Sequence, residues 1–127
     1  MSESAQSLTL RQGRVQVELA WIQAGRDLSV TLCGGDVPHI GAVAVSQPRP
    51  SHAEAGVTSA STSVITVHGH KEDDLARAAA ARLASALGVT VCVACGIHMD
   101  AIRPEEIIQV REMAGELVER LVERLSQ

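Results

Sequence analysis

Two histidines and the only lysine of the chain lie where a predicted strand passes into a predicted helix. The stretch reads His68, Gly69, His70 and Lys71. At the end of an extended strand the two imidazoles project to the same side, and Gly69 leaves the backbone open to a ligand. Lys71 lies just before a helix N-terminus, where free N–H groups and the helix dipole attract phosphate. The spacing predicts a phosphate-binding site. The alternative is a helix cap with solvated charges.

A second polar junction begins with Gly34, Gly35 and Asp36 and continues to His39. Paired glycines adopt backbone conformations that other residues avoid, and their N–H groups could form an anion-binding nest. The alternative is a tight turn that happens to use glycine. A loop histidine such as His39 is more often a hydrogen-bonded loop residue than a ligand.

Loop histidines and aspartates also raise the hypothesis of a metal-dependent enzyme. A divalent ion such as zinc accepts three such ligands plus water, although no spacing here matches a standard signature. The candidates are Asp36, His39, His68, His70, His98 and Asp100. The chain has no G-x-S-x-G, P-loop or G-x-G-x-x-G motif. Cys33 is a conceivable nucleophile without an assigned base.

Cys92 and Cys95 have the C-x-x-C spacing of redox and zinc sites. They fall in an apolar stretch that is predicted to be a strand. Three residues along a strand span roughly 10 Å and point to opposite faces, whereas a disulfide needs Cα atoms within about 7 Å. We therefore expect buried, unreactive thiols.

The composition excludes several classes of protein. The 127 residues are 46% hydrophobic and 20% charged, so one folded domain is expected. Trp21 is the only aromatic residue, which argues against a protein that stacks nucleic-acid bases. The net charge of −4 argues against a broad DNA-binding surface. No apolar run reaches the length of a membrane span and no signal region is evident, so a cytoplasmic location is expected.

Hydrophobic periodicity predicts a two-layer α+β domain in the order β-β-β-β-α-β-α. Residues 1–12 are expected to be a flexible leader and 13–127 a single domain. A Pro-containing stretch, 47–60, is expected to be a long, mobile loop. Strands are predicted at 14–22, 28–33, 40–46, 61–68 and 89–95. A first helix is predicted to open within 69–74 and to run to Leu87, and a second from Pro104 to Leu125. The strands before the first helix are expected to form an antiparallel meander.

Three segments taken together resemble the prenylated-flavin chaperone (LpdD-like) family. They are residues 34–45, which read GGDVPHIGAVAV, residues 69–73, which read GHKED, and residues 95–100, which read CGIHMD. The resemblance covers roughly residues 14 to 110. It implies a fold similar to proteasome-assembly chaperones and a homodimer. It also implies a non-catalytic partner of UbiD-type decarboxylases that act on gallate and related hydroxyarylic acids.

The resemblance further implies that the protein binds prenylated FMN as cargo. Members of the family are thought to protect the reduced cofactor from oxygen and to help pass it from the flavin prenyltransferase to the decarboxylase. On this reading 69–71 would hold the phosphate, the glycines would let a flat ring approach the backbone, and His39 and His98 would bind the flavin edge. The predicted cofactor-binding residues are Gly34, Gly35, Asp36, His39, Gly41, His68, Gly69, His70, Lys71, Gly96 and His98.

The shortage of aromatic side chains limits how a flavin could be held. Aliphatic side chains would have to sandwich the ring, and a second subunit could supply one wall. A further alternative is a structural adaptor without a ligand. It would dock on the decarboxylase through the last helix, whose apolar stripe is broader than one sheet face needs.

Overall fold

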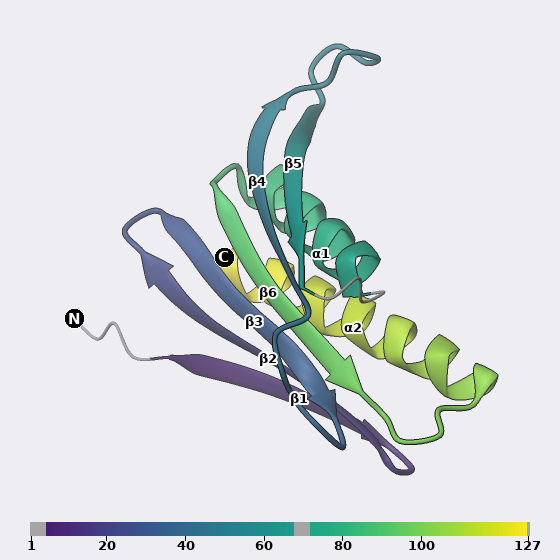
Figure 1. Cartoon of the computed structure of the whole chain (residues 1–127). Coiled ribbons are helices and arrows are strands. Elements are labelled where there is room, and N and C mark those ends of the chain that lie inside the picture. The colour runs from purple at the N-terminus through teal and green to yellow at the C-terminus, as the bar shows by residue number, and fades with distance from the viewer. Residues whose placement is uncertain (1–4, 68–71, 127) are drawn as a thin grey trace.

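The computed structural model describes residues 5–67 and 72–126, and it contains one six-stranded sheet and two helices (Figure 1). The strands are β1 (Gln6–Gln12), β2 (Val15–Ala24), β3 (Asp27–Gly35), β4 (Ala42–Pro50), β5 (Thr58–Thr66) and β6 (Val91–His98). The helices are α1 (Glu72–Leu87) and α2 (Pro104–Leu125).

The sheet has the strand order β1-β2-β3-β6-β4-β5. Only β3 and β6 pair in parallel, and the other four pairs are antiparallel. Both helices lie on the same face of the sheet (Figure 1). The predicted class, a two-layer α+β fold with a mainly antiparallel sheet, is therefore confirmed.

Aliphatic side chains on the helix side of the sheet form the core. In β2 the alternating residues Val15, Val17, Leu19 and Trp21 are buried, as their period of two requires. Small alanines bring α1 close to the sheet. The buried positions of the helices are Ala76, Ala79, Ala80, Leu83 and Ala84 in α1 and Val110, Met113, Ala114, Leu117, Val118 and Leu121 in α2.

The apolar stripe of α2 thus faces the core of this chain rather than a partner. Leu117 and Leu121 are fully buried, and the large aliphatic side chains of α2 that remain exposed are Ile107 and Ile108 in its first turns. Leu117 and Leu121 are therefore core residues of this chain, and docking through the last helix stays a prediction. Within the described residues, neither helix is long and apolar enough to cross a membrane.

The N-terminal segment differs from its prediction. Residues 6–12 were expected to belong to a flexible leader, but they form β1, which pairs along its whole length with β2. Leu8 and Leu10 pack against the core, while the residues between them are polar and exposed. Only two apolar residues mark this edge strand, so its periodicity was too weak to predict it.

The segment 47–60 was expected to be a long loop, and this prediction is wrong. Strand β4 continues to Pro50 and β5 begins at Thr58, so the loop is much shorter, and Pro48 pairs with Ala60. Pro lacks an N–H group and is tolerated in a strand only at a free edge. Beyond Ser46, β4 has no pairing with β6, so both prolines lie where one edge of β4 is free. The hairpin projects beyond the rest of the sheet (Figure 1).

The order of the central strands also departs from the predicted meander. Strand β6 lies between β3 and β4, so the connection 36–41 must cross β6 to reach β4. In Figure 1 this connection passes in front of β6, on the side away from the helices. The backbones meet at Gly96, where an added Cβ would lie 1.9 Å from the carbonyl oxygen of His39. Gly96 is therefore required by the crossing.

We predict that Gly96→Ala destabilises the fold by roughly 1–3 kcal/mol, because the backbone of the crossing segment must move. The matched control is Gly115→Ala in α2, where no atom lies within 4 Å of the added carbon. It should stabilise the protein by about 0.5–1 kcal/mol, since Gly is a poor helix former. Urea unfolding of both variants measures the difference. An unchanged midpoint for Gly96→Ala would contradict the crossing as described.

Candidate functional site

Two of the segments singled out from the sequence meet at one end of the sheet. Strands β3 and β6 are parallel neighbours, so both end at the same edge, and Gly35 is the register partner of His98. The connection 36–41 starts there and returns across β6, with the N–H of Gly41 donating to the carbonyl of Cys95 at 2.8 Å. Predicted site residues from two distant parts of the chain are thereby brought together.

The Gly34-Gly35 pair is used for close packing and a turn. An added Cβ at Gly34 would lie 2.1 Å from the carbonyl oxygen of Gln16, and Gly35 has a φ of +75°. The N–H groups of Asp36 and Val37 both donate to the carbonyl oxygen of His98, at 2.7 and 3.3 Å. Those donors are already engaged within the chain. The structure shows the tight turn, and the anion-binding nest stays a prediction.

His39 connects the crossing segment to the start of α1. Its Nε2 lies 3.1 Å from a carboxylate oxygen of Glu72, and its Nδ1 lies 3.0 Å from the carbonyl oxygen of Val37. Gly41 lies beneath this contact, because an added Cβ there would come within 2.9 Å of the Glu72 carboxylate. The Glu72 side chain is nearly buried. These contacts position the first turn of α1 against the end of the sheet.

The predicted phosphate-binding residues His68, Gly69, His70 and Lys71 lie outside the described residues. Both residues that flank them contact the same region. The N–H of Val67 donates to the carbonyl of Gly41 at 2.7 Å, and Glu72 lies against His39. The phosphate site therefore remains a prediction.

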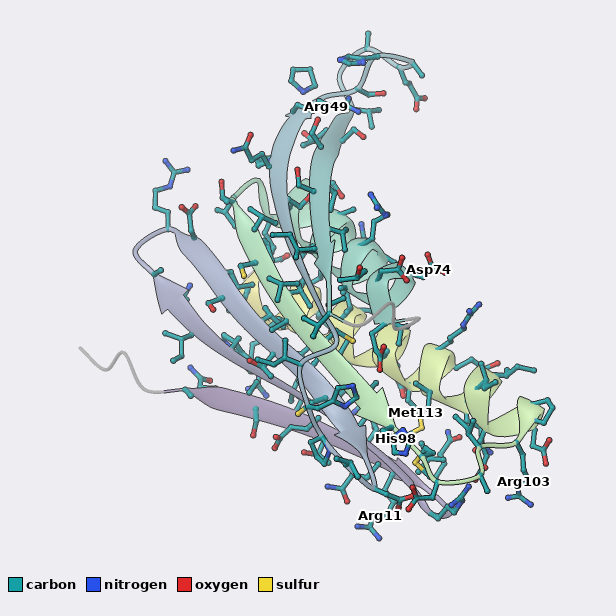
Figure 2. The ribbon with its side chains drawn as sticks, in the orientation of Figure 1. Arg11, Arg49, Asp74, His98, Arg103 and Met113 are labelled. Carbon is teal, nitrogen blue, oxygen red and sulfur yellow. The ribbon has the colours of Figure 1, made fainter. Side chains whose placement is uncertain are left out.

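His98, the last residue of β6, and Asp100, two residues further on, form an exposed polar pair. The His98 Nε2 lies 3.1 Å from an Asp100 carboxylate oxygen, and the two side chains are 54% and 76% exposed. The N–H of Asp100 donates to the Asp36 carboxylate at 2.9 Å. Figure 2 shows His98 at the end of β6, and Asp74 and Arg103 at the starts of α1 and α2. These accessible groups could bind a polar edge of a ligand.

An ion pair between the half-exposed Arg14 and the buried Glu106, which the sequence did not reveal, connects the segments at this end of the molecule. Arg14, in the turn just before β2, donates to both carboxylate oxygens of Glu106 at 2.6 and 2.7 Å and to the carbonyl of Asp100 at 3.0 Å. Glu106 also accepts from the N–H of Arg103 at 3.0 Å. The hydrogen bonds from Arg14 and then from Arg103 hold the pKa of Glu106 well below its usual range.

The sequence signal for Glu106 was local. An acidic residue two positions after a helix-starting proline often caps the helix, but its partner Arg14 is 92 residues away. No spacing rule connects two residues so far apart.

A mostly apolar cavity of about 300 Å³ opens beside this network, and the sequence did not reveal it either. It lies between the first turns of both helices and the end of β6. Its aliphatic lining consists of Leu75, Ile97, Ile102, Ile107 and Val110. Glu72, Asp74 and Arg111 supply its charged groups. Ile102 and Ile107 are each about two-fifths exposed, so a ligand would cover apolar surface here.

The metal and nucleophile hypotheses find little support in the described residues. No group of three or more His, Cys, Asp or Glu side chains there could hold a metal ion. The three cysteines are free. Burial raises the pKa of the Cys95 thiol to about 12 and also raises the pKa of Cys33, so both thiols stay protonated near pH 7.

The fold is similar to that of a proteasome assembly chaperone. A chain in the crystal structure of a novel chaperone complex for yeast 20S proteasome assembly matches with a TM-score of 0.61 at 10% sequence identity. The match covers 95% of this chain and 98% of that chain. This likeness shows the fold alone.

The family is defined more closely by the sequence. The model of the prenylated flavin chaperone LpdD-like domain matches residues 11–126, so the chain belongs to that family. The suspected resemblance is confirmed. No curated protein matches the chain.

We predict that Glu106→Gln lowers Tm by several degrees at pH 7, because Arg14 loses its charged partner. The folded-state pKa of Glu106 lies below its ordinary value of 4.5. The stabilisation is therefore present above about pH 4.5 and is lost as the pH falls toward the folded-state pKa. The difference in Tm between wild type and variant should shrink as the pH is lowered from about 6 to 3.

The matched control is Glu119→Gln, which removes the partner of Arg82 from a pair whose side chains are 50% and 55% exposed. Solvent screens such pairs, so Tm should change little. Equal losses in the two variants, or a loss for Glu106→Gln that does not depend on pH, would contradict the assigned role of the Arg14–Glu106 pair.

Proposed function

We propose that the protein binds prenylated FMN as cargo, without catalysing a reaction on it, and assists its delivery to a UbiD-type decarboxylase. The observation that carries the proposal is the convergence, on one end of the sheet, of described residues from all three family-like segments. Asp36, His39 and Gly41 come from the first segment, Glu72 from the second, and His98 from the third. Membership of the prenylated flavin chaperone family supports the identity of the cargo.

The chain offers separate groups for the separate parts of this cargo. On the basis of the sequence pattern, His70 and Lys71 are proposed to bind the phosphate. The exposed His98 side chain offers a polar contact for the flavin edge. The aliphatic cavity supplies a wall in place of aromatic stacking. Several weak contacts would allow the cofactor to dissociate again, as its release to an enzyme requires.

The finer features of this function are also proposals. We propose a cytoplasmic homodimer that receives cargo from a flavin prenyltransferase. Light scattering of the purified protein should give twice the mass of the 13.4 kDa chain. A monomer at working concentration would contradict the dimer and leave the cargo assignment standing.

We predict saturable binding when the protein is titrated anaerobically with reduced prenylated FMN and followed by absorbance or calorimetry. The double variant His70→Ala, Lys71→Ala should raise Kd by about tenfold or more, because two groups proposed for the phosphate are lost.

The control is Arg26→Ala, which removes a cation from the turn between β2 and β3 at the opposite end of the sheet. Its Kd should equal that of the wild type. The absence of saturable binding by the wild type would overturn the proposed function. Equal affinities for all three proteins would overturn the phosphate assignment alone.

A second prediction concerns delivery. Apo-decarboxylase mixed in air with the cargo-loaded protein should recover more activity than apo-decarboxylase mixed with the same amount of free reduced cofactor. Equal recovery in the two mixtures would leave binding intact and contradict delivery.

A further inference from the structure

The apolar cavity beside the site continues as a groove between the two helices. A second cavity of about 210 Å³ shares Leu75 and Arg111 with the first and has Leu32 of the sheet in its lining. The rest of its lining is mostly small, and consists of Ala78, Ala79, Arg82, Ala114, Gly115, Val118 and Glu119. The two hollows therefore form one groove, which runs from the site end of the molecule inward between α1 and α2.

A helix glycine keeps this groove open. Among the described glycines, Gly115 alone has neither a positive φ nor an atom within 4 Å of an added Cβ. Close packing and turn geometry therefore do not explain it, although glycine weakens a helix interior. A larger side chain at this position would fill the groove that Gly115 lines. The glycine at this position is explained if the groove must stay open to a ligand.

The charges along the groove indicate which part of a ligand enters it. Glu72 and Asp74 line the groove at the site end, where their charges disfavour the entry of a phosphate into the groove. At the other end, Arg82 and Glu119 are joined by hydrogen bonds of 2.7 and 2.9 Å. Arg111 lines both hollows and makes no hydrogen bond or ion pair with any other described residue. An uncharged apolar body with a carbonyl oxygen for Arg111 fits this pattern.

We propose that the α1–α2 groove is the subsite for the isoprenoid-bearing end of the flavin ring system, with Arg111 donating to a ring carbonyl oxygen. This inference rests on the proposed function. The aliphatic lining would cover the carbons that distinguish prenylated FMN from FMN. The phosphate would stay outside the groove, at the proposed contacts with His70 and Lys71. The groove then selects the prenylated form of the cofactor over the unmodified one.

The test compares the Kd of reduced prenylated FMN with that of reduced FMN for the wild type and two variants. Gly115→Leu fills the groove and should not weaken the helix, since leucine is a better helix former. The wild type should bind the prenylated form at least tenfold more tightly. In Gly115→Leu this preference should fall to about threefold or less while Tm stays equal or rises. Glu116→Leu, at an exposed neighbouring position outside the groove, should keep the preference.

The role of Arg111 is tested by Arg111→Gln against Arg77→Gln. Both arginines are exposed on a helix, but only Arg111 lines the groove. Arg111→Gln should raise Kd for both cofactors about tenfold, since both have the ring carbonyls, and Arg77→Gln should leave both values unchanged. Equal effects of the two changes would overturn the assigned contact.

The remaining outcomes separate the two proposals. If the wild type binds neither cofactor, the proposed function fails, and the groove assignment fails with it. If the wild type binds prenylated FMN and Gly115→Leu keeps the full preference, only the groove assignment is overturned. If Gly115→Leu instead changes the mass measured by light scattering and leaves cofactor binding intact, a second copy of the chain occupies the groove. The proposal is then likewise overturned.

Discussion

The insertion of β6 between β3 and β4 is the constraint on which the rest of the structure depends. It forces the connection from β3 to β4 to cross a strand, and the crossing is possible because Gly96 has no side chain. The same arrangement carries His39 to the start of α1 and places Gly35 beside His98. The polar groups at this end are therefore assembled by topology, since no local motif contains them all.

The sequence predicted the elements that carry a strong internal pattern. Alternation was sufficient for β2 and β3, helical spacing for α1 and α2, and an apolar run for β6. The prediction from sequence failed for β1, which has only two inward apolar residues. It also failed for the hairpin of β4 and β5, where Pro48 and Pro50 indicated a loop. A proline excludes a strand only where its missing N–H group would have to donate to a neighbouring strand. Whether a neighbour lies on that side is decided by the order of the strands in the sheet.

The candidate site shows the same division between local and distant information. Glycines and histidines at junctions could be found from their types and spacing. The structure places the segment 34–41 beside Gly96 and His98. The Arg14–Glu106 pair and the cavity lined by Ile102 and Ile107 could not be found, because each joins elements distant in the chain. The near absence of aromatic residues, visible from composition alone, agrees with the aliphatic lining of that cavity.

The central position of β6 also has a consequence for how the chain folds during synthesis. Strands β1 to β5 leave the ribosome first, as two separate antiparallel sets, and the facing edges of β3 and β4 have unpaired backbone groups until β6 arrives. The partners in β3 and β6 are separated by about half of the chain, and Arg14 and Glu106 by more than half, and such non-local contacts form late. Because the polar end of the sheet needs both contacts, we expect the nascent chain to become competent to bind only when α2 is complete.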